Sequence, residues 1–242
     1  MKALAWTLGG TTLALLVVGE PRQAAGLAVI SLLFGAIFLG AWWFRDRPRA
    51  ESHADEARRL RLRYSFRDPH DLLSAPHPLL HRFVHMRGLE HVSWGTWNGL
   101  EVEVFEYWYA VGSDPQRNDY ERFTCVLTPV PATWPDLTIE PERLVTRIPQ
   151  AVAMPDIRFE SEAFNRAFHV RSADPRFASA LVDARMIAWL VDDAPGYGFQ
   201  IAAHRLLAFT ERVEPWQTES VLGMTGGFLT QVPGAVASLY PA

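Results

Sequence analysis

Residues 92–107 read VSWGTWNGLEVEVFEY and contain the clearest fold signal in the chain. Asn98 and Gly99 at its centre tolerate the positive φ angles of a two-residue type I′ turn. Apolar and polar residues alternate beside this pair, which is the pattern of a strand with one buried face. The stretch therefore predicts a β-hairpin that belongs to an antiparallel sheet.

Further elements are predicted on both sides of this hairpin. Strands are expected over residues 120–127, 199–202 and 206–210, and helices just before Gly88, over 177–191 and over 221–232. The helix over 177–191 has the strongest pattern, since Asp174 can cap it and Pro175 can occupy its first position. Together these elements predict an α+β domain with a mainly antiparallel sheet packed by helices.

The first 44 residues are apolar and carry few charges. The run 24–44 has 21 uncharged residues, spans roughly 31 Å as a helix, and ends in aromatic residues before Arg45, as a transmembrane helix does. The run 3–19 is shorter, and a four-residue turn separates the two. The fold class predicted for the whole chain is therefore a two-helix transmembrane hairpin followed by the α+β domain. A cleaved signal peptide and a buried soluble helix are the alternatives for the first run.

Charge divides the chain into three predicted parts: residues 1–44 are the transmembrane hairpin, 45–63 a basic juxtamembrane linker, and 64–242 the acidic soluble domain. The linker carries seven arginines against four acidic residues, whereas 64–242 carries 14 arginines against 22 acidic residues, a net charge of −8. The positive-inside rule then predicts a multi-pass protein of the cell membrane with its soluble domain in the cytoplasm.

The predicted partners follow from the same charges. The lipid bilayer is expected to bind residues 3–44, and anionic lipid headgroups are expected near Arg58, Arg59, Arg61 and Arg63. A solvated helical spacer with internal Glu/Arg pairs is the alternative for this segment. Nucleic acid is excluded as a partner, because the soluble domain is acidic and its arginines are scattered.

Histidines 77, 81 and 85 are the most metal-like series in the sequence. Their four-residue spacing puts three imidazoles on one helical face, and two such side chains can share Zn²⁺. The sequence lacks an HExxH pattern and a nearby cysteine, so a polar helix face is the preferred interpretation. No metal ligand and no cofactor are therefore assigned.

Other candidate catalytic groups also have structural explanations. Cys125 is the sole cysteine, and His169 or His204 is its candidate base. Its place in an alternating strand predicts an inert buried thiol instead. The carboxylates Glu101, Glu103 and Glu106 lie on one strand, with Glu106 on the opposite side, and a solvated strand face explains them. No catalytic residue is assigned.

Aromatic density supplies the functional hypothesis. Nine aromatic residues lie between positions 94 and 134, more than one inward strand face holds. We expect a membrane-anchored, cytoplasm-facing binding or scaffold module that takes a protein or small ligand near Trp94, Trp97 and Trp108. The alternative is a membrane-tethered, metal-assisted enzyme with a site at the His77/His81/His85 helix or the aromatic sheet. An assembly factor with helix contacts at small residues is a third hypothesis.

Several short motifs resemble an uncharacterised bacterial family with two N-terminal transmembrane helices and a soluble domain of unknown function. The matching positions are Phe159, Glu160, Phe164, Phe168, Val170, Asp174, Ala178 and Leu181, the Asn98-Gly99 hairpin with Tyr107 and Tyr109, and the run 135–142. The likeness covers most of residues 90–210. It implies the architecture alone, and no activity, ligand or catalytic residue.

Overall fold

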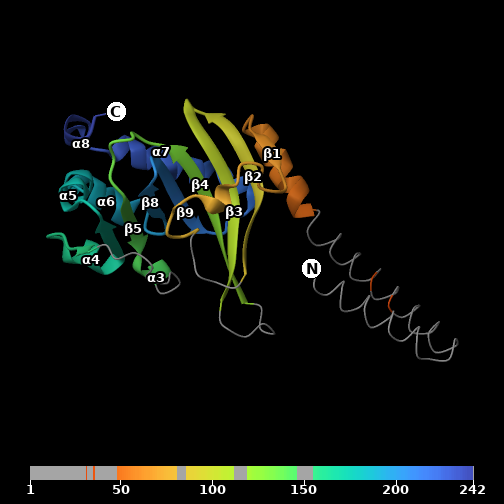
Figure 1. Ribbon diagram of the computed structural model, residues 1–242, viewed down its shortest axis with the longest axis horizontal. Coiled ribbons are helices and arrows are strands. Elements are labelled where there is room, and N and C mark those ends of the chain that lie inside the picture. The colour runs from red at the N-terminus through yellow and green to blue at the C-terminus, as the bar shows by residue number, and fades with distance from the viewer. Residues whose placement is uncertain are drawn as a thin grey trace. The chain divides into compact units, whose positions relative to one another are not determined.

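The computed structural model describes residues 48–80, 86–111, 119–145 and 155–241, together with Ser31 and Gly35. These residues contain a nine-stranded sheet in the order β1-β2-β3-β4-β9-β8-β5-β7-β6 (Figure 1). Every neighbouring pair of strands is antiparallel. Strands β1 to β4 follow one another in the sequence and form one half of the sheet. Strand β9 pairs with both β4 and β8, and so connects this half to β8, β5, β7 and β6.

The elements have the following bounds. The strands are β1 (Arg63–Ser65), β2 (Arg87–Trp97), β3 (Leu100–Val111), β4 (Asp119–Pro129), β5 (Leu137–Pro141), β6 (Asp156–Ile157), β7 (Phe168–Ser172), β8 (Gly198–Ala202) and β9 (Arg205–Glu211). The helices are one over 48–59, η1 (Leu72–Ser74), α3 (Glu142–Val145), α4 (Glu162–Ala167), α5 (Pro175–Leu181), α6 (Ala184–Asp192), η2 (Pro215–Gln217), α7 (Thr218–Gln231) and α8 (Gly234–Leu239).

The hairpin predicted at Asn98 and Gly99 is confirmed. Both residues have positive φ, 47° and 84°, and Trp97 of β2 lies opposite Leu100 of β3. The register of this pair shifts between Glu90 and Ser93, so β2 contains a β-bulge there. A bulge turns a strand locally and re-aims the side chains at its centre.

The two faces of the sheet are buried by different kinds of structure. On one face, here called the helix face, Val104, Val126 and Ala208 lie side by side on β3, β4 and β9. Helix 48–59 and α7 cover it, and α7 lies behind the strands in Figure 1. On the loop face the neighbouring row is Phe105, Cys125 and Phe209, covered by η1 and residues 79–80. Strand alternation therefore supplies two separate cores.

The predicted helix over 177–191 is two helices. Asp174 caps α5 as expected, since its side chain accepts a hydrogen bond from the Arg176 amide at 2.9 Å. Asp183 interrupts the pattern because its side chain caps α6 in the same way, at 2.9 Å from the Met186 amide. An aspartate is a favoured cap residue, and here the local cap prevails over the continuous apolar stripe.

The helix predicted before Gly88 does not extend to that residue, because strand β2 begins at Arg87. Gly88 lies inside this strand and does not end a helix. A Cβ atom on Gly88 would lie 2.5 Å from the Trp108 ring, so the glycine is required by close packing. Residues 81–85, which include His81 and His85, lie outside the described residues.

The predicted fold class is corrected by the structure. The described residues form mostly an antiparallel sheet with helices, and none of their helices is long and apolar enough to span a membrane. The runs 3–19 and 24–44 lie outside the described residues, except for Ser31 and Gly35. The prediction of a hairpin rested on uncharged length, on the aromatic residues before Arg45 and on a four-residue turn, which are typical of a spanning helix but do not suffice for one.

The structure describes residues 48–63 of the predicted basic linker. Positions 48–59 are helical, and Arg63 begins β1. Ala57, Leu60 and Leu62 are buried against the helix face of the sheet. The compact unit accordingly runs from Ser52 to Ala242, and Met1–Glu51 form a separate unit.

Candidate functional site

An open groove of about 330 Å³ lies on the loop face, where β2, β3, β4 and β9 meet. Its lining residues come from consecutive cross-strand rows of the sheet: Trp94, Gly95, Thr96, Glu101, Val102, Glu103, Leu127, Pro129 and Arg205. The alternation around the Asn98-Gly99 turn is what puts an aromatic ring and two carboxylates on one side. The groove is therefore lined by both apolar and charged side chains.

Ion pairs hold the charged wall of the groove. The Glu103 carboxylate accepts a hydrogen bond from the Arg205 guanidinium and lies 2.6 Å from Nδ1 of His70. The His70 ring packs edge-on against Trp94, with 5.0 Å between ring centroids. Burial lowers the pKa of Arg205 from its ordinary value. Because Glu103 already has Arg205 and His70 as partners, this arrangement suits binding better than proton transfer.

The three tryptophans of the expected binding surface do not form one surface. Trp94 packs with the loop-face core and lines the groove. Trp97 packs with the helix-face core, near Gly226 of α7. Trp108 lies on Gly88 and contacts Tyr120 edge-on, toward the other end of the hairpin. Only Trp94 of the three lines this groove.

Cys125 lies far from both of its candidate bases. It is fully buried on β4, and burial raises the pKa of its thiol well above the ordinary value. His169 is on β7, four strands away, or about 19 Å at the usual strand spacing. His204 is in the turn between β8 and β9. It lies five residues before Phe209, the residue of β9 opposite Cys125, which is about 17 Å along the strand. The thiol is a core group in this arrangement.

The histidine series is only partly described. His77 is fully buried, and its Nε2 lies 3.1 Å from the carbonyl oxygen of Arg205. This contact fastens the covering segment to β9. Glu101 and Glu103 both line the groove, while Glu106 points to the helix face as predicted. The structure therefore divides the three carboxylates between two different sites.

The four arginines expected at lipid headgroups are all exposed. Arg58 is paired with Asp55, and Arg59 is paired with Glu56 and with Glu219 of α7. The Arg59–Glu56 pair is an internal Glu/Arg contact of the kind that the spacer interpretation expects. Arg61 and Arg63 follow them at the end of the helical segment, where the chain enters β1.

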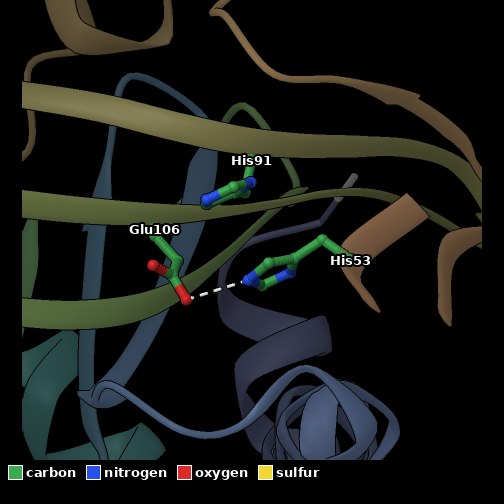
Figure 2. Close-up of side chains that lie close together, drawn as sticks. All are labelled: His53, His91 and Glu106. Carbon is green, nitrogen blue, oxygen red and sulfur yellow. Dashed lines mark hydrogen bonds and ion pairs between the residues drawn. The ribbon is translucent and has the colours of Figure 1, made fainter. Parts of the chain in front are cut away.

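His53, His91 and Glu106 form a cluster on the helix face that no sequence motif indicates. One potential ligand atom from each of the three lies within 4.8 Å of the others. The residues come from helix 48–59, β2 and β3, and Figure 2 shows the two rings one above the other beside the carboxylate. All three are buried, with exposed fractions of 8%, 5% and 2%.

Comparison with known proteins gives one informative likeness. No family model and no curated protein matches this chain. The crystal structure of the mycobacterial trehalose monomycolate transport factor A, TtfA, is similar, with a TM-score of 0.57 and 13% sequence identity. The likeness covers 77% of this chain and 97% of TtfA. At this identity it shows a shared fold alone.

Proposed function

We propose that this chain is a binding or scaffold module whose loop-face groove takes a segment of a partner protein. The observation that carries the proposal is the groove itself, in which Trp94 lies beside the paired side chains of Glu103 and Arg205. Tryptophan and arginine are the residue types that most often dominate the binding energy of protein interfaces. At about 330 Å³ the groove is at the small end of ligand pockets, and it is open, which suits one or two side chains of a partner.

The chemistry of the groove suggests what the partner presents. The partly exposed ring of Trp94 offers apolar surface, and the exposed carboxylate of Glu101 lies on the rim. Residues 64–242 carry a net charge of −8. We therefore propose a partner segment with an apolar side chain next to a lysine or arginine, which this acidic domain attracts at long range.

The fold gives this proposal a biological setting. TtfA is named as a transport factor for trehalose monomycolate. We propose that the present chain likewise serves as an accessory module of a transport or assembly process rather than as an enzyme. The support is the shared fold together with a groove in which Glu103 is already paired with Arg205 and contacts His70.

Groove variants test this function through crosslinking in living cells. A photo-crosslinking amino acid at Thr96, which is exposed on the rim, is expected to give discrete protein adducts. Trp94→Ala combined with Glu101→Lys should lower adduct yield about tenfold or more, because it removes an aromatic anchor and reverses a rim charge. Unchanged adducts in a variant that melts at the wild-type temperature would contradict the proposal.

The matched control changes the same residue types elsewhere. Trp97→Ala removes a tryptophan from the opposite face of the same hairpin. Glu160→Lys reverses an exposed carboxylate outside the groove. This pair should leave the adducts of Thr96 in place, so that a loss common to both sets would point to misfolding or to bulk charge.

We also propose that the arginines after helix 48–59 bind the anionic surface of the cytoplasmic membrane leaflet. Removing Arg61 and Arg63 together, as glutamines, should weaken binding of a 48–242 fragment to anionic vesicles about 30-fold, since each arginine contributes about 1 kcal/mol. Sedimentation with vesicles measures this loss. Arg166→Gln/Arg176→Gln changes net charge equally at exposed positions elsewhere and should have little effect. Equal loss in both pairs would contradict a local lipid surface.

A further inference from the structure

Three segments that are distant in sequence bring two imidazoles and one carboxylate together on the helix face. Nε2 of His53 lies 3.0 Å from Oε1 of Glu106, and the rings of His53 and His91 stack with centroids 4.3 Å apart. In Figure 2 each ring directs a nitrogen to the side on which Glu106 lies. Buried polar groups are costly unless they are satisfied, so a convergence of three such groups calls for an explanation.

The backbone of β2 is distorted at the position that supplies His91. Its φ is +57°, in the left-handed region that residues with a Cβ atom rarely adopt. The residue lies within the β-bulge between Glu90 and Ser93. Bulges of this kind re-aim a side chain, and backbone strain of this kind gathers at functional sites. Here the distortion directs an imidazole into the cluster.

The spacing of the cluster matches a metal site. A metal with bonds of about 2.0–2.1 Å to histidine nitrogen and carboxylate oxygen has tetrahedral ligands about 3.3 Å apart. The 3.0 Å between His53 and Glu106 is already close to that value. Since the three ligand atoms lie within 4.8 Å of one another, closing the site takes a movement of about 1.5 Å at most.

The surroundings admit one ion and no larger ligand. The enclosed space beside the cluster is about 10 Å³ and is bounded by apolar side chains such as Leu60, Leu62 and Val104. That is room for about one water-sized particle. An organic substrate does not fit in this space, whereas a metal ion held by three side chains does.

Tyr64 provides the second layer of such a site. Its hydroxyl lies 2.9 Å from Nδ1 of His91. With a metal bound through Nε2 of this ring, the Nδ1 proton would lie within hydrogen-bond distance of the phenol oxygen. Metal-binding histidines usually have such a partner on the second nitrogen.

We propose that His53, His91 and Glu106 bind one divalent transition-metal ion of the zinc class. Two imidazoles and a carboxylate are ligands that Zn²⁺ accepts, whereas Mg²⁺ and Ca²⁺ prefer oxygen ligands alone. The ion fastens helix 48–59 to β2 and β3, because one ligand comes from that helix and two come from the sheet. Metal binding thereby stabilises the docked position of the helix.

Zinc titration of the full chain tests the proposal. Protein freed of metal by a chelator is expected to bind one Zn²⁺ per chain, as measured by elemental analysis and by competition with a chelating dye. His53→Gln, His91→Gln and Glu106→Gln should each weaken zinc binding on the order of 100-fold or more. His169→Gln is the matched control, since this histidine contacts Glu142 and Asp156 at the surface. It should leave zinc binding unchanged.

A second measurement keeps the test decisive if a variant does not fold. Hydrogen exchange of the wild-type chain should slow in residues 52–62 when one equivalent of Zn²⁺ is added. The absence of stoichiometric zinc binding would overturn the proposal. So would full zinc affinity in a folded Glu106→Gln variant, loss of zinc only in His169→Gln, or zinc binding that leaves exchange in 52–62 unaltered. The groove plays no part in this test, so failure of the metal site leaves the proposed binding function separately testable.

Discussion

Phe199→Ala is expected to lower the free energy of unfolding by about 3–5 kcal/mol, the usual cost of truncating a buried phenylalanine. Phe199 is fully buried on β8 at the helix face. Its ring stacks on Phe228 of α7, with centroids 4.4 Å apart, and contacts Trp189 of α6 at 5.9 Å. One side chain therefore ties two helices to the sheet, and its loss leaves a cavity that three elements border.

Urea unfolding followed by tryptophan fluorescence measures this loss as a lower midpoint at constant slope. Phe66→Ala is the matched control, because that ring is 39% exposed and its truncation should cost far less. Equal losses of unfolding free energy in the two variants would contradict the conclusion that burial of Phe199 stabilises the fold. A changed slope would instead show that the two-state description fails for the variant.

Much of the sheet can be predicted from local signals. Asn98 and Gly99 specify their own turn, and the alternation beside them specifies which residues share a face. The strands expected over 120–127, 199–202 and 206–210 appear as β4, β8 and β9 with nearby bounds. These predictions succeed because short connections make sequence neighbours into sheet neighbours.

The helical predictions fail where two local signals compete. The apolar stripe from Phe177 to Val191 predicts one helix, and Asp183 within it predicts a cap. The structure follows the cap and separates α5 from α6. The transmembrane prediction fails for a different reason. It depended on apolar length and flanking aromatic residues, whereas the helices among the described residues are too short or too polar to span a membrane.

Part of the cluster on the helix face can be predicted from the register of the β2–β3 hairpin. Counting back from Trp97 opposite Leu100 in an ideal hairpin puts His91 opposite Glu106 on one face. That count was available from the sequence and would have identified two of the three residues. The third, His53, comes from a helix 53 residues before Glu106, and no local pattern predicts where that helix docks. The count also does not predict the bulge at His91, which shifts the register between Glu90 and Ser93.

Gln200→Leu is expected to destabilise the chain by about 3 kcal/mol, although it exchanges a polar side chain for an apolar one of similar size. The Gln200 amide is fully buried on the loop face. Its oxygen accepts the Leu79 amide proton at 3.0 Å, and its nitrogen donates to the Glu140 carboxylate at 2.7 Å. Leucine leaves a buried backbone donor without its acceptor and removes a hydrogen bond from a buried charge, and both losses are costly.

The double variant Glu140→Leu/Gln200→Leu separates these two losses. Removing both partners of a buried hydrogen bond costs less than removing one, so the pair should show a coupling energy of about 1–3 kcal/mol. Gln231→Leu, a partly exposed glutamine at the end of α7, should change stability by about 0.5 kcal/mol or less. A Gln200→Leu variant within that range would show that the network contributes little.

The same substitution links this network to the groove. Leu79 belongs to the segment that covers the loop face, and His70 earlier in that segment contacts Glu103 and Trp94 in the groove. Freeing the Leu79 amide should speed its hydrogen exchange and loosen the segment before the sheet unfolds. Because His70 holds the wall of the groove, Gln200→Leu should also weaken the crosslinks formed at Thr96 without touching a residue that lines it. Intact crosslinks together with fast exchange at Leu79 would show that the groove keeps its shape independently of its cover.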